Sequence, residues 1–247
     1  MLPAELAYGA LVEALGADAE AVLKELEVYR EAEPPPSYSL DDEAVGVLRE
    51  ADERGWSRFH LVGYSGGGAA ALAFAARFPD RLWSLALLEP AWAGRWDLSP
   101  TEQALWDSYD ELEALPPDQF MGAFMRLGVK PGVELPSPPP GEAPPWMAKR
   151  PAGIRAFMLT FASYDLDREA LRRFRRPVYY ALGGRSNPDQ YGEIAERLGT
   201  VFSDFTLEVF AERHHFDPPH RIEPDRLARA LKTFWSLGEQ HENGSQA

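Results

Sequence analysis

The stretch Gly63–Gly67 reads GYSGG and places a single serine, Ser65, between an apolar segment and a segment rich in alanine. The pattern G-x-S-x-G between a strand and a helix exposes a serine hydroxyl as a nucleophile. The turn strains the serine backbone, and we expect side chains at Gly63 and Gly67 to collide with neighbouring segments. The helix begins with unpaired N–H groups, which puts Gly66 N–H in place to bind an oxyanion. The motif therefore predicts a nucleophilic serine.

A phosphate-binding turn is the competing interpretation of the same glycines. The run GYSGGGAAA contains neither the lysine of a P-loop nor the spacing G-x-G-x-x-G. The sequence therefore favours the nucleophile over a phosphate site.

A serine hydroxyl is a poor nucleophile at neutral pH and needs a base to accept its proton. The chain has five histidines, of which His60 lies in the strand before the serine and His241 in the polar tail. The other three, His214, His215 and His220, lie between the last predicted strand and the last predicted helix. We expect the base among these three.

A carboxylate that orients the histidine and stabilises its positive form would complete the site. Glu89 ends the otherwise apolar segment LWSLALLE, so its side chain would emerge at the same edge of a parallel sheet as Ser65. A charged group at the end of such a strand needs a partner, and a histidine would serve. The other interpretation is a rim carboxylate paired with an arginine such as Arg95.

Apolar segments alternate with helical ones along most of the chain, which is typical of a mostly parallel sheet with helices on both faces. The predicted strands are 26–30, 58–63, 82–89, 177–184 and 205–210, and the predicted helices are 3–15, 18–25, 39–55, 67–79, 99–115, 117–128, 153–164, 189–199 and 223–238.

The block 91–176 interrupts this alternation and is rich in tryptophan, methionine and proline. We interpret it as a helical cap inserted into a core formed by residues 1–90 and 177–237. The polar end, 238–247, is expected to be disordered.

Composition and charge exclude several classes of protein. The 247 residues include no cysteine, which excludes disulfides, cysteine metal sites and a thiol nucleophile. The net charge is −14 at pH 7, which argues against nucleic acid as a partner, and the basic run Arg172–Arg176 reads as a solvated helix end. No apolar run approaches the roughly 20 residues of a membrane span, and no signal pattern opens the chain. We expect a cytoplasmic protein without a cofactor or membrane partner.

With these motifs, residues 3–237 resemble the α/β-hydrolase fold superfamily, including a cap between the sixth and seventh strands of that fold. The resemblance implies a serine hydrolase and selects His215 as the base, because the family's histidine precedes an aromatic residue in the loop to the final helix. His214 and His220 remain alternates.

The family usually supplies its acid after the seventh strand, where this chain has the neutral Asn187. The resemblance also includes hydrolases such as haloalkane dehalogenases, which carry a glutamate after strand six, and this makes Glu89 the first candidate. Asp189 and Asp217 stay open. Because Ser65 replaces the aspartate nucleophile of the dehalogenases, dehalogenation is disfavoured.

The first strands of the fold, with the His-Gly turn that gives the second oxyanion donor, are not found in the sequence, so the chain looks N-terminally shortened. Either the start lies upstream of Met1, or other residues refill the gap, for example by pairing 26–30 with 58–63, or catalysis is impaired. Losing one oxyanion donor typically costs about a hundredfold to a thousandfold in rate. The alternative function is therefore ligand binding by a catalytically impaired protein. A further interpretation is a homo-oligomer in which a second chain completes the sheet.

The expected substrate is a small or medium apolar ester-like or acyl compound. The aromatic side chains of the cap should line a largely dry pocket, two or three of them facing the substrate. The expected substrate-binding residues are Tyr64, Trp92, Trp96 and Trp146, and other candidate rings are Trp106, Phe124 and Phe157.

Overall fold

The structure, a computed structural model, describes residues 2–136 and 144–243. Its sheet has four strands in the order β1-β2-β3-β4, and each neighbouring pair is parallel. The strands are β1 (Phe59–Ser65), β2 (Leu82–Pro90), β3 (Val178–Gly183) and β4 (Phe205–Phe210). The predicted α/β class with a parallel sheet is confirmed. Within the described residues no strand lies beyond β1, in agreement with the absence of the fold's first strands.

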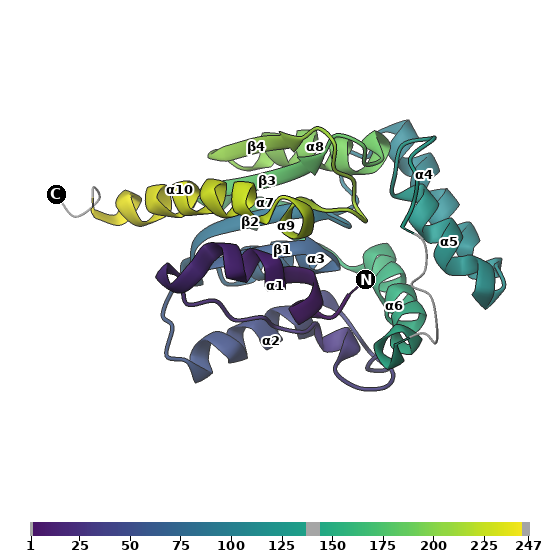
Figure 1. The fold of residues 1–247 in the computed structure, drawn as a ribbon, viewed down its shortest axis with the longest axis horizontal. Coiled ribbons are helices and arrows are strands. Elements are labelled where there is room, and N and C mark those ends of the chain that lie inside the picture. Colours follow the sequence, from purple (N-terminus) through teal and green to yellow (C-terminus); the bar gives the residue numbers. More distant parts are fainter. Residues whose placement is uncertain (1, 137–143, 244–247) are drawn as a thin grey trace.

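Side chains along β2 alternate between two apolar clusters, one on each face of the sheet. Leu85 and Leu87 join the cluster with helices α2 (Leu40–Glu53) and α3 (Gly66–Arg77). Ala86 and Leu88 join the cluster with α1 (Ala4–Leu15) and α10 (Pro224–Asn243), which lie side by side in Figure 1. Both faces are therefore covered, which explains why β2 reads as a continuous apolar run.

The helix α2 begins where its sequence predicted. The Ser39 hydroxyl accepts the N–H of Asp41, and the Asp42 carboxylate accepts the N–H of Ser39 at 2.7 Å. These bonds satisfy backbone donors that the first turn leaves free.

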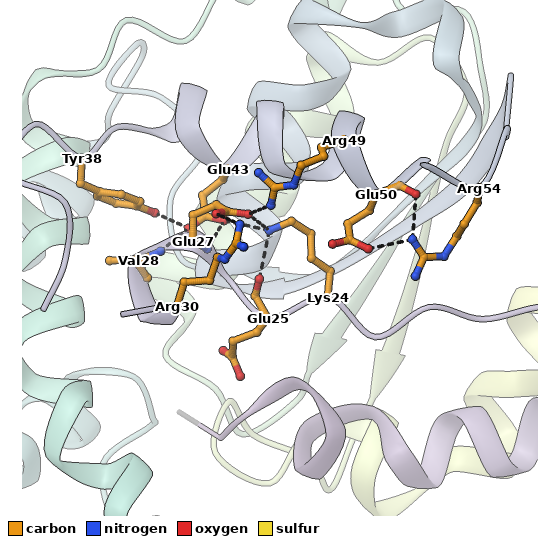
Figure 2. Close-up of polar contacts among 10 residues, drawn as sticks. All are labelled: Lys24, Glu25, Glu27, Val28, Arg30, Tyr38, Glu43, Arg49, Glu50 and Arg54. Atoms are coloured by element: carbon orange, nitrogen blue, oxygen red, sulfur yellow. Dashed lines mark hydrogen bonds and ion pairs between the residues drawn. The ribbon is translucent and has the colours of Figure 1, made fainter. Parts of the chain in front are cut away.

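The short helix and the strand predicted at 18–25 and 26–30 are both wrong. The structure has 3₁₀ turns at Gly16–Asp18 and Glu27–Tyr29, with no regular element between them. A strand needs a ladder partner, and here the backbone donors go to a side chain instead. The Glu43 carboxylate, on α2, accepts the N–H groups of Glu27 and Val28 at 2.9 and 3.0 Å, as Figure 2 shows.

The pairing of 26–30 with β1 is also not formed. The Tyr64 N–H, at the edge of β1 away from β2, donates to the hydroxyl of Tyr8 at 2.8 Å. A phenol from α1 thus occupies a position where a neighbouring strand would offer a carbonyl.

Helices α4 (Pro100–Asp110), α5 (Pro117–Leu127) and α6 (Arg150–Ser163) come between β2 and β3 in the chain. The 3₁₀ turns Glu111–Ala114 and Pro145–Lys149 accompany them. Figure 1 shows these helices together at one end of the sheet, and residues 137–143 lie outside the described part. The short helix α7 (Arg168–Arg173) packs on α3 of the core.

After β3 the chain forms a single turn of π-helix (Pro188–Gly192), called the π turn below, and continues as α8 (Glu193–Val201). The short helix η3 (Pro79–Arg81) precedes β2, and α9 (Pro219–Ile222) precedes α10. The expected disordered tail is a partial error, since α10 continues through Asn243, while residues 244–247 lie outside the described part. Among the described helices, none has the length and apolar character to span a bilayer.

Candidate active site

Ser65 lies at the junction of β1 and α3 with φ 55° and ψ −122°. A positive φ in a residue that carries a Cβ is costly and persists only where the surroundings impose it. A Cβ at Gly63 would lie 2.4 Å from the carbonyl oxygen of Gly67, so the first turn of α3 packs directly on β1. At Gly67 a Cβ would meet nothing closer than Leu26 at 3.9 Å. The expected collision therefore occurs at Gly63 and not at Gly67.

Three side chains from three elements meet at this junction. The Oγ atom of Ser65 lies 3.0 Å from Nε2 of His215, and Nδ1 of His215 lies 3.2 Å from Oε2 of Glu89. An ionised carboxylate only accepts hydrogen bonds, so the proton of the neutral imidazole lies on Nδ1 and Nε2 is free to accept from the serine. All three residues are at least 95% buried. This chain of contacts can carry a proton from the hydroxyl to the imidazole.

Glu89 has both carboxylate oxygens occupied. Oε1 accepts the N–H of Gly183, at the end of β3, at 2.7 Å, and Oε2 faces His215. Glu89 also has a positive φ of 46°, a conformation shared in the described chain by just two other non-glycine residues, Ser65 and Asp97. The end of β2 is thus strained where it presents the carboxylate to the histidine.

Aromatic rings hold the imidazole of His215 in place. The ring of Tyr191 stacks on it with centroids 4.4 Å apart and planes 13° apart, and Tyr64 lies 5.0 Å away at 32°. Burial raises the pKa of the Tyr64 phenol, so it stays protonated and donates to the carbonyl of His215. Packing and hydrogen bonding therefore fix both the ring and the backbone of this histidine.

The alternate histidines have other partners. His214 accepts the N–H of Phe216 at 3.2 Å, and burial lowers its pKa. His220 is completely buried against the rings of Tyr8 and Tyr64, and burial lowers its pKa to about 3. A pKa lowered by burial makes each of them a weaker base than an ordinary imidazole.

The alternate acids serve other purposes. The side chain of Asp189 is exposed. The neutral Asn187, at the position of the family's usual acid, donates to the carbonyl of Leu127 and accepts the N–H of Asp189. Asp217 pairs with Arg213 at 2.7 Å. The part of the chain that is described holds no group of three or more potential protein ligands for a metal ion.

A hollow opens beside Ser65 between the sheet and helices α4, α5 and α6. Apart from Ser65, Gly66 and His215, its lining is mostly apolar and aromatic. The remaining lining residues are Ala91, Trp106, Tyr109, Phe124, Ile154, Phe157, Met158, Phe161, Gln190 and Tyr191. The ring of Phe157 lies against Gly66, where an added Cβ would be 2.9 Å from it.

The four side chains expected to bind substrate lie outside this lining. Tyr64 lies against His215, and Trp92 stacks on Phe161 at 5.3 Å and lines a neighbouring hollow. Trp96 donates to the carbonyl of Leu166, and the ring of Trp146 lies beside the Arg150 guanidinium. The other candidate rings, Trp106, Phe124 and Phe157, do line the hollow.

Sequence reasoning missed Tyr109, Gln190 and Tyr191. Gln190 and Tyr191 lie three and four residues after Asn187, the position examined for the family's usual acid. A polar residue and an aromatic residue after Asn187 and Pro188 were therefore the available signal. The π turn that brings them to the hollow is not readable from periodicity.

Comparison with known proteins identifies the family of the chain. A family model described as alpha/beta hydrolase fold matches residues 30–218. A segment of 55 residues is 42% identical to RutD of Caulobacter segnis, a protein named for carbamate hydrolysis. That match covers 22% of this chain and 21% of the relative, so the likeness to RutD is local.

Solved structures resemble the whole fold. A haloalkane dehalogenase variant, DbeA-M1, from Bradyrhizobium elkanii has a TM-score of 0.66 at 14% identity, covering 98% of this chain and 88% of its own. The carboxylesterase CesB from Bacillus subtilis has a TM-score of 0.59 at 14% identity, covering 92% of this chain and 78% of its own. At these sequence identities the two structures show the fold alone. The matched family model extends over most of the chain. The chain therefore belongs to the α/β-hydrolase fold family of hydrolases.

Proposed function

We propose that this protein is a serine hydrolase that cleaves small or medium, largely apolar ester-like or acyl substrates through an acyl-enzyme. The observation that carries the proposal is the continuous contact from Ser65 Oγ through the two ring nitrogens of His215 to Glu89. In this proposal Ser65 is the nucleophile, His215 the general base and Glu89 the acid that orients it.

The reaction follows from the positions of these groups. Ser65 Oγ attacks the substrate carbonyl while Nε2 of His215 takes its proton, and the imidazolium is stabilised by Glu89. The N–H of Gly66 donates to the oxyanion of the tetrahedral intermediate. The imidazolium then protonates the leaving group, and a water molecule activated by His215 hydrolyses the acyl-serine.

The lining of the hollow supports an apolar acyl or leaving group. Phe124, Ile154, Met158 and Phe161 offer no strong hydrogen-bonding group, so water in the hollow is displaced by an apolar group at little cost. The relative named for carbamate hydrolysis and the carboxylesterase neighbour support esters and carbamates as the first compounds to test. A serine in place of the aspartate nucleophile of the dehalogenases disfavours dehalogenation.

The alternative is a ligand-binding protein on the same scaffold with impaired catalysis. Phe157 packs against Gly66, which narrows the space at the proposed oxyanion donor. If Phe157 keeps this position when a ligand is bound, binding is favoured over turnover.

Labelling by a fluorophosphonate probe, together with turnover of short-chain p-nitrophenyl esters, tests the proposal. We expect labelling and turnover in the native protein and neither in Ser65→Ala. Ser236→Ala, which removes an exposed hydroxyl on α10, should behave as native. Absence of labelling in the native protein across pH 6–9, with esters bound but not cleaved, would favour the binding protein instead.

A further inference from the structure

The π turn Pro188–Gly192 brings a buried polar group to the wall of the hollow. The Nε2 atom of Gln190 donates to the carbonyl of Ala91 at 2.9 Å, and its Oε1 accepts the hydroxyl of Tyr109 at 2.8 Å. Gln190 is 3% exposed and Tyr109 4%. One residue from α4 and one from the π turn are thus joined into a fixed pair, which we call the polar corner. Helical turns of the π type are frequent at functional sites.

The polar corner has hydrogen-bonding capacity that these two bonds do not use. A carboxamide nitrogen carries two hydrogens, and the carbonyl of Ala91 takes one of them. The phenol oxygen of Tyr109 donates its hydrogen to Gln190 and keeps its lone pairs. Burial raises the pKa of this phenol, so it remains a neutral donor to Gln190. The orientation of both groups is set before any ligand arrives.

Gln190 and Tyr109 line the same hollow as Ser65, and most other side chains in that lining are apolar. A polar pair that only joined α4 to the core would be expected to lie inside the packing between α4 and the core. Here it lies at the edge of the hollow, where an unused donor favours a ligand with a matching acceptor. A site built in this way rejects analogues that lack the matching group, because its own polar atoms then lose a partner.

We propose that the polar corner formed by Tyr109 and Gln190 determines specificity, by selecting substrates whose apolar body carries one hydrogen-bond acceptor, such as a ketone or an amide carbonyl, away from the scissile bond. The substrate class is thus an acyl compound with a second, internal polar group. This inference rests on the proposed function, because it assigns the same hollow to a substrate of Ser65.

Matched esters test the polar corner directly. We would measure kcat/KM for p-nitrophenyl hexanoate and heptanoate and for their 5-oxo and 6-oxo derivatives. We expect the native protein to prefer at least one oxo ester about tenfold over its parent, the usual scale of one buried hydrogen bond. In Tyr109→Phe and Gln190→Met the ratio of oxo to parent should fall at least fivefold.

Tyr179→Phe is the matched control. It removes a phenol hydroxyl that is bound to Glu208, and neither residue lines the hollow, so it should retain the native ratio. The proposal is overturned if the native protein prefers neither oxo ester, or if Tyr109→Phe and Gln190→Met slow both members of a pair equally. The second result would assign the pair a purely structural role.

Binding to Ser65→Ala separates this inference from the catalytic one. Calorimetry with the same uncleaved esters should show the oxo preference, and the preference should be lost when Gln190→Met is added. A preference seen in binding while the native protein shows no turnover would reject the hydrolase and retain the polar corner. Turnover by the native protein without any preference for the oxo esters would retain the hydrolase and reject the polar corner.

Discussion

At the scale of single residues, the site is defined by a carboxylate whose two oxygens have different partners. Gly183 N–H holds one oxygen of Glu89, and His215 faces the other. The first contact ties the carboxylate to the neighbouring strand, so its position does not depend on the histidine. A side chain held in this way can orient an imidazole without moving during the reaction.

Glu89→Gln is expected to lower kcat for p-nitrophenyl esters by about a thousandfold or more, because the amide leaves the imidazolium uncompensated and permits the wrong tautomer. Steady-state kinetics with the purified variant checks this. Asp189→Asn changes the exposed carboxylate that follows β3 and should remain within about twofold of native. Equal losses in the two variants would contradict the assignment of Glu89 as the acid.

At the scale of elements, a buried ionic cluster holds the irregular segment before α2. The Glu43 carboxylate, inaccessible to solvent, accepts two backbone N–H groups and the hydroxyl of Tyr38, and Lys24 lies 3.6 Å from it (Figure 2). Burial raises the pKa of Glu43. Helix α6 contacts this segment, because Thr160 donates to the carbonyl of Tyr38 at 3.1 Å. The cluster therefore supports one wall of the hollow from a distance.

Glu43→Gln should reduce the free energy of unfolding by about 1–3 kcal/mol, because an amide hydrogen replaces an acceptor that faces buried donors. Urea denaturation at pH 7 measures the change. Glu50→Gln, on the same helix and also drawn in Figure 2, removes a surface pair with Arg54 and should cost less than about 1 kcal/mol. If the two variants are equally stable, the cluster does not have the role assigned to it.

At the scale of the whole molecule, folding buries a histidine in its neutral form. His220 lies among Tyr8, Tyr64 and Arg221, and its pKa falls from 6.5 to about 3 because burial penalises the charged ring. Between these two values the unfolded chain binds a proton that the folded chain does not bind. The contribution of the neutral His220 to stability is therefore complete above pH 6.5 and is lost as the pH falls toward 3.

The His220→Phe variant should be less sensitive to acid than the native protein. Lowering the pH from 7 to 5 is expected to cost the native protein about 2 kcal/mol more than the variant, at about 1.4 kcal/mol for each pH unit below 6.5. Urea unfolding of both proteins at the two pH values gives this difference directly. Identical losses would show that His220 is protonated in the folded state at pH 5.

The sequence by itself determined the layered α/β fold and the segments that form β1 and β2. These depend on local periodicity, and a residue at the end of a parallel strand, such as Ser65 or Glu89, must lie at the shared edge of the sheet. The segment 26–30 shows the limit of this reasoning, because strand-like residues without a ladder partner turned to the side chain of Glu43 instead.

The residues by themselves left three histidines open, the family resemblance selected His215, and the tertiary structure brings this histidine to Ser65. Tertiary structure alone decided which rings line the hollow. His215 and His220 are close in sequence, but the path of the loop sends the ring of His215 to Ser65 and places the ring of His220 against Tyr8 and Tyr64. The lining depends on how the helices between β2 and β3 pack over the sheet, and on a π turn that directs Gln190 and Tyr191 toward it. Such contacts join residues far apart in the chain, and no local pattern encodes them.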